Sequence, residues 1–341
     1  MYRRRKLLIA AGGLGGGERL MGTGEGALFV RPDADAFREW VRENKPHSPV
    51  DKRMSEQEAV RKFVRPGDYV ATDLYGMVRA PMSVVRELIR QGPENLSLAG
   101  QGGIDIDLLV ASGLVRRIDN VYIGHEVFGL SNAYRRLVAS GKVEVTEWTN
   151  AALAWRFKAA AMGIPFIPSR TMLGTDTFRR SAARSGPCPF SGQELCFLPA
   201  LAVDVGLIHV HRCDKYGNAQ IDGTGGLGFE LSRASKKLIL STERIVPEST
   251  IRKTPERTVI PHYLVDAVVD ARYGSHPGEM CYEYAMDRPR VQEYLKAMET
   301  EEGGRAYLKE YIHGVRSHEE YLELVGGAKQ MRKLNNACKG R

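Results

Sequence analysis

Cysteine is scarce in this sequence, and its spacing follows no framework. The 341 residues include five cysteines, an odd number, and no Cys-x-x-Cys pair occurs. Disulfide-stabilised proteins usually carry an even set at regular spacings, so we expect no disulfides here. The chain is long enough, and with 43% hydrophobic residues apolar enough, to bury a core without cross-links. This cysteine usage is typical of a reducing compartment and indicates a cytoplasmic protein.

Long hydrophobic runs are also missing. No stretch approaches the ~20 apolar residues that a membrane-spanning helix needs, which argues against association with a membrane. Residues 3–17 are basic and then apolar, but glycines interrupt the apolar part and no small-x-small cleavage site is evident. We therefore interpret residues 1–50 as an N-terminal extension that is partly disordered where glycine is frequent.

Basic residues do not gather into one long run. The formal net charge is +8, and the densest group is Arg3-Arg4-Arg5-Lys6. This scatter of basic residues argues against nucleic acid as a partner. A diffuse positive field would instead attract anionic substrates.

Five potential metal ligands lie within a short stretch, so zinc must be considered. Zinc sites favour ligands in tighter pairs than those found here. Residues 205–211, VGLIHVH, alternate in the manner of a strand that places both histidines on one face. We therefore expect no metal site formed by Cys188, Cys196, His209, His211 and Cys213.

Hydrophobic periodicity between residues 51 and 287 switches repeatedly between strand and helix patterns. Such alternation predicts an α/β domain with an open, mostly parallel sheet and helices on both faces. Residues 288–341 read as a charged, helical C-terminal tail. The predicted helices are 34–44, 56–64, 82–91, 104–112, 131–140, 150–163 and 229–236, and the predicted strands are 68–73, 95–100, 118–124, 142–147, 165–168, 205–211, 237–243 and 264–271.

Local signals define several boundaries. Ser55 with Glu58 is a possible capping box at the start of a helix. Pro81 stands at a tolerated first-turn position, and Gly217-Asn218 predicts a hairpin-like turn. Residues 169–200 lack this alternation of strand and helix patterns and are rich in glycine and proline. We expect this stretch to be a long loop, either functional or disordered.

Four glycine-bearing loops directly follow predicted strands. In open α/β sheets ligands bind at the carboxyl ends of the strands, where glycine lets the backbone approach a ligand and stabilise an oxyanion. Together the loops would make an anion-friendly cleft large enough for a thioester, although each one alone fits an ordinary strand-to-helix turn. The candidate binding residues are Asp73, Leu74, Tyr75 and Gly76, then Gln101, Gly102 and Gly103, then Gly124 and His125, and finally Met172, Leu173 and Gly174.

Glu126 is the candidate catalytic acid. It follows an apolar strand in a glycine-bounded loop, where a carboxylate could attack a thioester or activate water. The alternative is an acid that complements the dipole of the next helix. No Gly-x-Ser-x-Gly elbow occurs, which argues against a serine hydrolase. Gly223-x-Gly225-x-x-Gly228 matches a dinucleotide fingerprint formally, but it follows only a short strand and reads rather as a chance loop.

An ordered series of segments resembles a known family. The segments are GDYVATDLYGMVRAPMSVVRELIRQG, NLSLAGQGGIDIDLLVASGLV, AALAWRFKAAAMGIPFIPSRTMLGTD, VDVGLIHVHRCDKYGNAQI, LILSTERIVPESTIRKTPERT and VDAVVDARYGSHPGEM. They are similar to the α (A) subunit of family I CoA-transferases, in particular of the glutaconate CoA-transferase type. The resemblance runs from about residue 50 to residue 325.

The resemblance implies a partner and a reaction. The partner would be a related β (B) subunit in an A2B2 or larger assembly. The substrates would be an acyl-CoA and a carboxylic acid, with coenzyme A as a substrate and no further cofactor. The family's ping-pong reaction uses a glutamate that normally lies on the B subunit, so the glycine loops of this chain would line the site from the other side.

Three points bear on the activity that the resemblance implies. Such subunits often carry a Gly-Gly-Phe turn where this chain has Asp73-Leu74-Tyr75-Gly76, and the bulkier turn would alter the pocket. A second branch, the steroid-ring-opening CoA hydrolases, uses a catalytic glutamate of the α chain, and Glu126 falls in the corresponding loop. A non-enzymatic sensor of acyl-CoA or another ligand on the same fold is the third possibility, and the lack of a readable helix-turn-helix before residue 50 argues against it.

Overall fold

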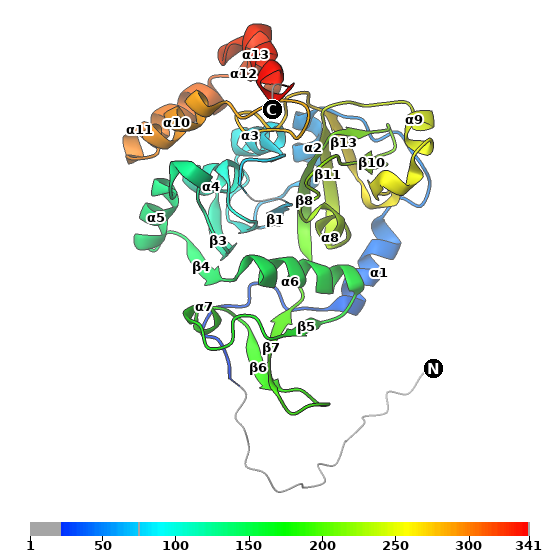
Figure 1. Cartoon of the computed structure of the whole chain (residues 1–341), viewed down its shortest axis with the longest axis vertical. Helices are drawn as coiled ribbons and strands as arrows, with labels where there is room; N and C mark the ends of the chain where they lie inside the picture. The colour runs from blue at the N-terminus through cyan, green and yellow to red at the C-terminus, as the bar shows by residue number, and fades with distance from the viewer. Residues whose placement is uncertain (1–21, 74–75, 340–341) are drawn as a thin grey trace, which may run out of the picture.

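A seven-stranded parallel sheet forms the centre of the molecule. The computed structural model describes residues 22–73 and 76–339 (Figure 1). The strand order is β13-β11-β8-β1-β2-β3-β4, and each neighbouring pair is parallel. The predicted fold class is therefore confirmed. The strands are β1 (Tyr69–Thr72), β2 (Leu96–Ala99), β3 (Val115–Asn120), β4 (Glu144–Glu147), β8 (Val203–Val210), β11 (Ser235–Thr242) and β13 (Ala267–Asp270).

Helices bury the sheet from both sides. In Figure 1, α3 and α4 lie on one side of the sheet and α6 and α8 on the other. Along β1, Val70 packs into the core on the α3 side, whereas Tyr69 and Ala71 pack into the core on the α6 side. Because both faces are covered, β1 and β2 are buried at every position. These helices are α2 (Glu56–Phe63), α3 (Met82–Gln91), α4 (Ile104–Ala111), α5 (Asn132–Ala139), α6 (Asn150–Met162) and α8 (Gly228–Arg233).

Helix ends follow the local sequence signals. The predicted capping box forms: Glu58 N donates to Ser55 Oγ at 3.2 Å, and Ser55 N donates to Glu58 Oε2 at 2.9 Å. Helix α3 occupies its predicted range and ends at Gly92, whose φ of 66° is the left-handed conformation that glycine adopts without strain. Short-range chemistry thus decides where these helices begin and end.

The prediction of a long loop at residues 169–200 was wrong. This stretch contains α7 (Asp176–Arg179) and supplies most of an antiparallel sheet made of β5 (Phe166–Ser169), β7 (Glu194–Pro199) and β6 (Arg184–Pro187). The central strand is β7. Pro168 and Pro187 lie on the two edge strands, where a residue without an N–H group is tolerated. Proline and glycine therefore mark edges and ends here rather than the absence of strands.

A second small antiparallel sheet lies after β8. It consists of β9 (Arg212–Cys213), β10 (Ala219–Gln220) and β12 (Thr258–Ile260). The predicted turn at Gly217-Asn218 joins β9 to β10, and Asp214 Oδ1 accepts from the N–H groups of Tyr216, Gly217 and Asn218. The shorter elements nearby are α9 (Glu248–Arg252) and the 3₁₀ turns Pro255–Arg257 and His262–Leu264.

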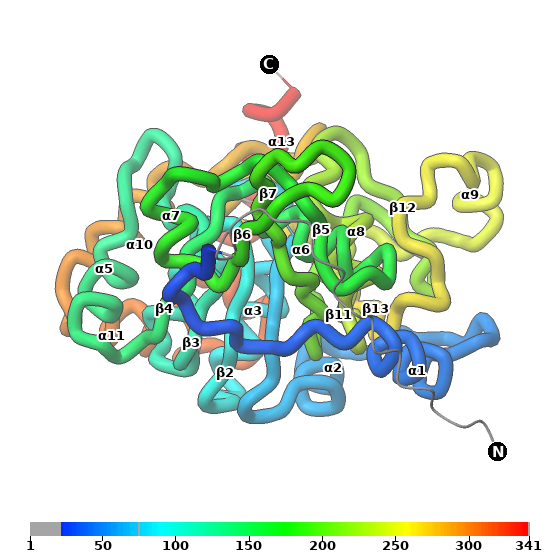
Figure 2. Tube along the Cα trace, turned by 90° about the horizontal axis from the view of Figure 1, so that it is seen from below, coloured from blue at the N-terminus to red at the C-terminus, as the bar shows by residue number. Residues whose placement is uncertain are grey.

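The segment from residue 22 to residue 50 is packed against the domain. Figure 2 shows it crossing one end of the molecule to reach α1 (Ala34–Asn44), whose bounds are those predicted. Thr23 bridges to Arg184, and Lys45 Nζ forms a buried ion pair with Asp266 at 2.5 Å. Residues 1–21, which hold most of the glycine-rich part, lie outside the described residues. The boundary near residue 51 stays a prediction.

The C-terminal tail is helical and is tied to α3. Arg86 of α3 donates to His318 Nδ1 at 3.0 Å, and its guanidinium stacks 3.6 Å from the centre of the Tyr321 ring. Among the described residues, none of the helices is both long and apolar enough to cross a bilayer. The tail elements are α10 (Arg288–Ala297), α11 (Glu301–Leu308), the π-turn Lys309–His313, α12 (His318–Leu324) and α13 (Gly327–Lys339).

Candidate active site

The order of the parallel strands creates a switch point between β1 and β8. From β1 the chain continues through β2, β3 and β4 on one side, and from β8 it continues through β11 and β13 on the other. Loops that leave neighbouring strands at such a point diverge to opposite faces, and ligands bind in the crevice between them. The carboxyl ends of β1 and β8 are therefore where a site is expected.

Three of the four predicted glycine loops meet at this edge. A Cβ atom added to Gly103 would overlap the carbonyl oxygen of Gly76, so the first and second loops touch through backbone. Gly102 bridges to Ile123, which joins the second loop to the third. A Cβ atom on Gly76 would lie 2.6 Å from Glu126 Oε1, so the third loop also contacts the first. Leu74 and Tyr75, two further predicted binding residues, lie outside the described residues.

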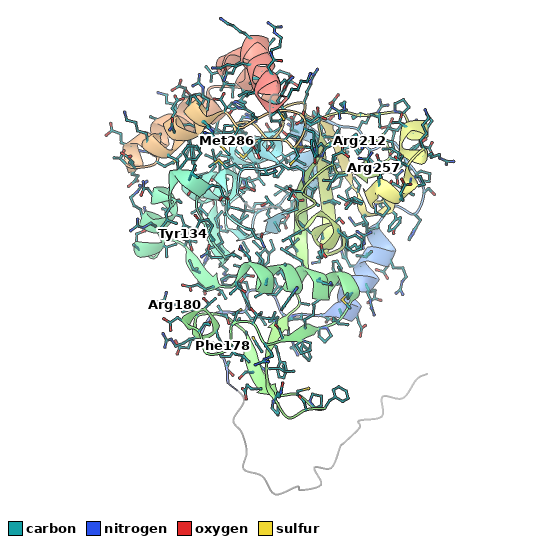
Figure 3. All side chains as sticks on the ribbon, in the orientation of Figure 1. Tyr134, Phe178, Arg180, Arg212, Arg257 and Met286 are labelled. Atoms are coloured by element: carbon teal, nitrogen blue, oxygen red, sulfur yellow. The ribbon has the colours of Figure 1, made fainter. Side chains whose placement is uncertain are left out.

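The fourth loop packs elsewhere. Met172 is buried in the core on the α6 side, and Leu173 packs against the same core. Thr175 caps α7. Just beyond this helix, Arg180, which is labelled in Figure 3, pairs with Glu147 at the end of β4 with an N–O distance of 3.0 Å. Any contribution of Met172, Leu173 and Gly174 to binding stays a prediction.

Glu126 is exposed and has unusual backbone geometry. Its φ is 52°, a left-handed value that non-glycine residues seldom adopt and that costs about 1–3 kcal/mol. It opens the 3₁₀ turn Glu126–Phe128, in which His125 N donates to Gly129 O at 2.8 Å. This conformation brings the carboxylate over Gly76. The structure therefore places the predicted acid beside the glycine loops.

His125, the neighbour of Glu126, is fully buried. Its Nε2 lies 3.4 Å from Asp107 Oδ2, and its ring packs 5.8 Å from that of Tyr294. The ring anchors the third loop in the core on the α3 side. The exposed Glu126 and the buried His125 therefore have different surroundings although they are adjacent in sequence.

The Asp73 carboxylate is held in a buried ion pair and is not a free anion. Its Oδ2 accepts from Arg79 Nη2 at 2.5 Å, and both side chains are 0% exposed. Burial raises the pKa of Asp73, and the Arg79 guanidinium partly opposes that shift. Arg79 also donates to His209 O at 2.6 Å and to Gly225 O at 3.0 Å, so it links β8 to a third segment. Arg79 is not among the predicted binding residues, since no local sequence pattern marks it.

That third segment is residues 222–228, which we call the switch-point loop. It joins β10 to α8 and contains the glycine run that matched a dinucleotide fingerprint. A hollow of about 410 Å³ lies beside it, lined by Gln101, Asn150, Thr224, Gly226 and Leu227. Gln101 was predicted as a binding residue. The other four were missed, because Asn150 and the switch-point loop are distant in sequence from the first three loops.

Other titratable groups near the switch point are buried. Burial raises the pKa of Asp105 to about 6. His209 contacts Ser241 Oγ and Glu243 Oε1, each at 2.8 Å, and Tyr284 also donates to Glu243.

The two histidines near the switch point do not form a shared metal site. His211 contacts Cys281 O at 2.9 Å, separately from His209. Within residues 22–73 and 76–339, no three His, Cys, Asp or Glu side chains gather as metal ligands.

Most of the sequence matches a known protein family. The family described as coenzyme A transferase matches residues 53–271, which include β1, β8 and all four predicted loops. This chain belongs to the coenzyme A transferase family. The predicted family is therefore confirmed, and with it the interpretation of the chain as an enzyme subunit of this family.

Individual relatives of this chain carry several activities in their names. The A chain of glutaconate CoA-transferase from Acidaminococcus fermentans is 30% identical over 299 residues, which is 82% of this chain and 93% of that protein. The cholesterol ring-cleaving hydrolase IpdA subunit from Mycobacterium tuberculosis is 30% identical over 278 residues, 77% of this chain and 94% of that one.

Solved structures agree with the sequence relatives. Glutaconate coenzyme A-transferase from A. fermentans has a TM-score of 0.80 at 29% identity, covering 83% of this chain and 95% of that chain. A variant of the decarboxylase AibA/AibB has a TM-score of 0.67 at 27% identity, covering 76% and 98%. Because the relatives are named for transfer, hydrolysis and decarboxylation, membership of the family does not by itself identify the reaction of this chain.

Proposed function

We propose that this chain is the α subunit of a heteromeric CoA-transferase, which moves CoA between an acyl-CoA and a carboxylic acid. The glutamate that attacks the thioester would lie on a related β subunit. That glutamate would displace CoA thiolate and form a mixed anhydride, and the thiolate would then attack the anhydride to give a glutamyl-CoA thioester and release the acid. The acceptor acid would take CoA by the same two steps in reverse.

The observation that carries this proposal is the meeting of three glycine loops beside a hollow lined by neutral polar groups. Gln101 and Asn150 can donate hydrogen bonds to a thioester carbonyl without trapping the product carboxylates as a cation would. Such donors stabilise the oxyanion that develops when a thioester is attacked. The buried carboxylate of Asp73 is held by Arg79, so it is not free to attack. This chain would thus supply the walls and donors of a site that a partner completes.

The purified chain alone is expected to show no measurable CoA transfer, and its complex with a β-type subunit is expected to be active. The measurement is transfer of CoA from an acyl-CoA to acetate by the chain alone and after co-expression with the β-type chain of the same genome. Robust transfer by the single chain would contradict the proposal. Hydrolysis without transfer by the complex would favour the second candidate below.

The position of Glu126 favours a second candidate, hydrolysis or carbon–carbon bond cleavage of a CoA ester. Its exposed carboxylate lies over Gly76 on a strained backbone, and strain of this kind clusters at functional sites. The relative named as a cholesterol ring-cleaving hydrolase subunit is 30% identical to this chain, as is the glutaconate CoA-transferase subunit. In this reaction Glu126 would activate water for attack on the substrate carbonyl.

Glu126→Gln separates the two candidates, because glutamine keeps the size of the side chain and removes its basicity. If Glu126 is the general base, turnover by the complex is expected to fall by about 10²–10⁴-fold. If the nucleophile is on the partner, transfer should stay within a few-fold of wild type. Glu144→Gln, at an exposed acid of β4, is the matched control and should leave either activity unchanged.

A further inference from the structure

We propose that the switch-point loop, residues 222–228, forms the wall that selects the acyl group, and that it favours uncharged acyl groups over those carrying a second carboxylate. This inference rests on the proposed function and specifies its substrate class. It assigns a role to the glycine run that the dinucleotide fingerprint does not explain.

Ion pairs hold the N-terminal end of the switch-point loop in place. Asp222 accepts from Arg212 Nη1 at 2.6 Å and from Arg212 Nη2 at 3.0 Å, and it also accepts from Arg257. Figure 3 shows Arg212 and Arg257 lying close together. His211 Nδ1 accepts from Asp222 N at 3.0 Å. Bidentate pairs of this kind hold both distance and angle, so the loop leaves β10 in a defined direction.

The middle of the loop is held by the buried ion pair at the end of β1. Arg79 Nη2 donates to Gly225 O at 3.0 Å, and Leu227 N donates to Asp73 O at 2.7 Å. Because Arg79 and the Asp73 side chain are fully buried, these contacts are shielded from water and position the loop firmly. Arg79 is thus a positioning residue that acts through the loop.

The loop presents a neutral surface to the hollow. Thr224 and Gly226 are exposed, Leu227 is half-buried, and the opposite wall is Gln101 with Asn150. Gln101 Nε2 donates to Asn150 O at 3.1 Å, which ties the two residues of that wall together. None of the five lining residues is charged. The nearby cations Arg79 and Arg212 are already paired with Asp73 and Asp222.

Where the partner subunit closes the hollow, a second carboxylate on the acyl group would therefore lose water without gaining an ion pair. Burial of an unpaired charge is strongly unfavourable. Burial of a terminal methyl group against Leu227 is instead favourable. The expected substrates are CoA thioesters of short monocarboxylic acids. Leu227 and Thr224 are the residues that would determine this preference.

The experiment compares valeryl-CoA with glutaryl-CoA as donors to acetate, using the complex with its β-type subunit. These acyl groups have the same chain length and differ in the terminal carboxylate. Wild type is expected to prefer valeryl-CoA at least tenfold in kcat/KM. Leu227→Lys supplies a cation and is expected to shift the ratio toward glutaryl-CoA by tenfold or more. Thr224→Lys, at an exposed position, should shift it in the same direction and covers the case in which Leu227→Lys does not fold.

Phe229→Lys is the matched control. Phe229 is 51% exposed, follows the loop on α8 and stacks on Arg233 rather than lining the hollow. It should leave the ratio within twofold of wild type. An active complex whose ratio neither Leu227→Lys nor Thr224→Lys changes, or a wild type that prefers glutaryl-CoA, overturns the inference. A complex that transfers CoA from other acyl-CoA donors but from neither of these two also overturns the inference, whereas a complex that transfers CoA from no acyl-CoA contradicts the proposed function instead.

Discussion

Replacing Asp73 by asparagine is expected to lower the free energy of unfolding by about 3–5 kcal/mol. The substitution keeps the size of the side chain but leaves the Arg79 guanidinium buried without its counter-charge, and an unpaired buried charge has this cost. Arg79 would also hold Gly225 less firmly. The measurement is urea unfolding of the complex or chain followed by circular dichroism.

Two further variants make the test specific to the buried pair. Asp73→Asn with Arg79→Met removes both charges and should recover much of the loss, because no charge remains uncompensated. Asp51→Asn breaks the exposed pair between Asp51 and Arg53, whose side chains are 44% and 54% exposed, and should leave the unfolding midpoint nearly unchanged. Equal effects of Asp73→Asn and Asp51→Asn would show that burial does not strengthen the pair.

Gly103→Ala is expected to abolish most of the activity and to destabilise the fold by about 1–3 kcal/mol. The added Cβ atom would overlap the carbonyl oxygen of Gly76, and neither backbone segment has a flexible side chain that could yield. The first and second glycine loops would therefore separate, and the donors around the hollow would lose their alignment. Because a displacement of about 1 Å can cost a factor of 10² in rate, we expect turnover of the complex to fall by at least that factor.

Gly304→Ala provides the control for Gly103→Ala. Gly304 is also buried, but its added Cβ atom would meet only Met298 Sδ at 3.4 Å, an ordinary contact. Since it lies within α11, alanine should stabilise that helix slightly and leave turnover unchanged. Wild-type turnover in Gly103→Ala would show that the contact between the two glycine loops is not needed for catalysis.

The sequence by itself determined the parts that depend on neighbours along the chain. The bounds of α1 and α3, the capping box of Ser55 with Glu58 and the turn at Gly217-Asn218 follow from short-range chemistry. The parallel sheet follows from the alternation of strand and helix patterns, which reports burial on two faces. The position of the first three glycine loops at one sheet edge follows in turn, because each of them leaves a strand of the parallel sheet, whereas the fourth follows β5 of an antiparallel sheet.

The tertiary structure alone decided which of these residues contact one another and which are buried away from solvent. It paired Asp73 with Arg79, buried His125 against Asp107, and left Glu126 exposed over Gly76. It also brought the switch-point loop to Asn150. The reason is physical: burial and pairing depend on strand order across the sheet, which places β8 beside β1 although most of the domain separates them in sequence. No local pattern of residue types encodes that adjacency.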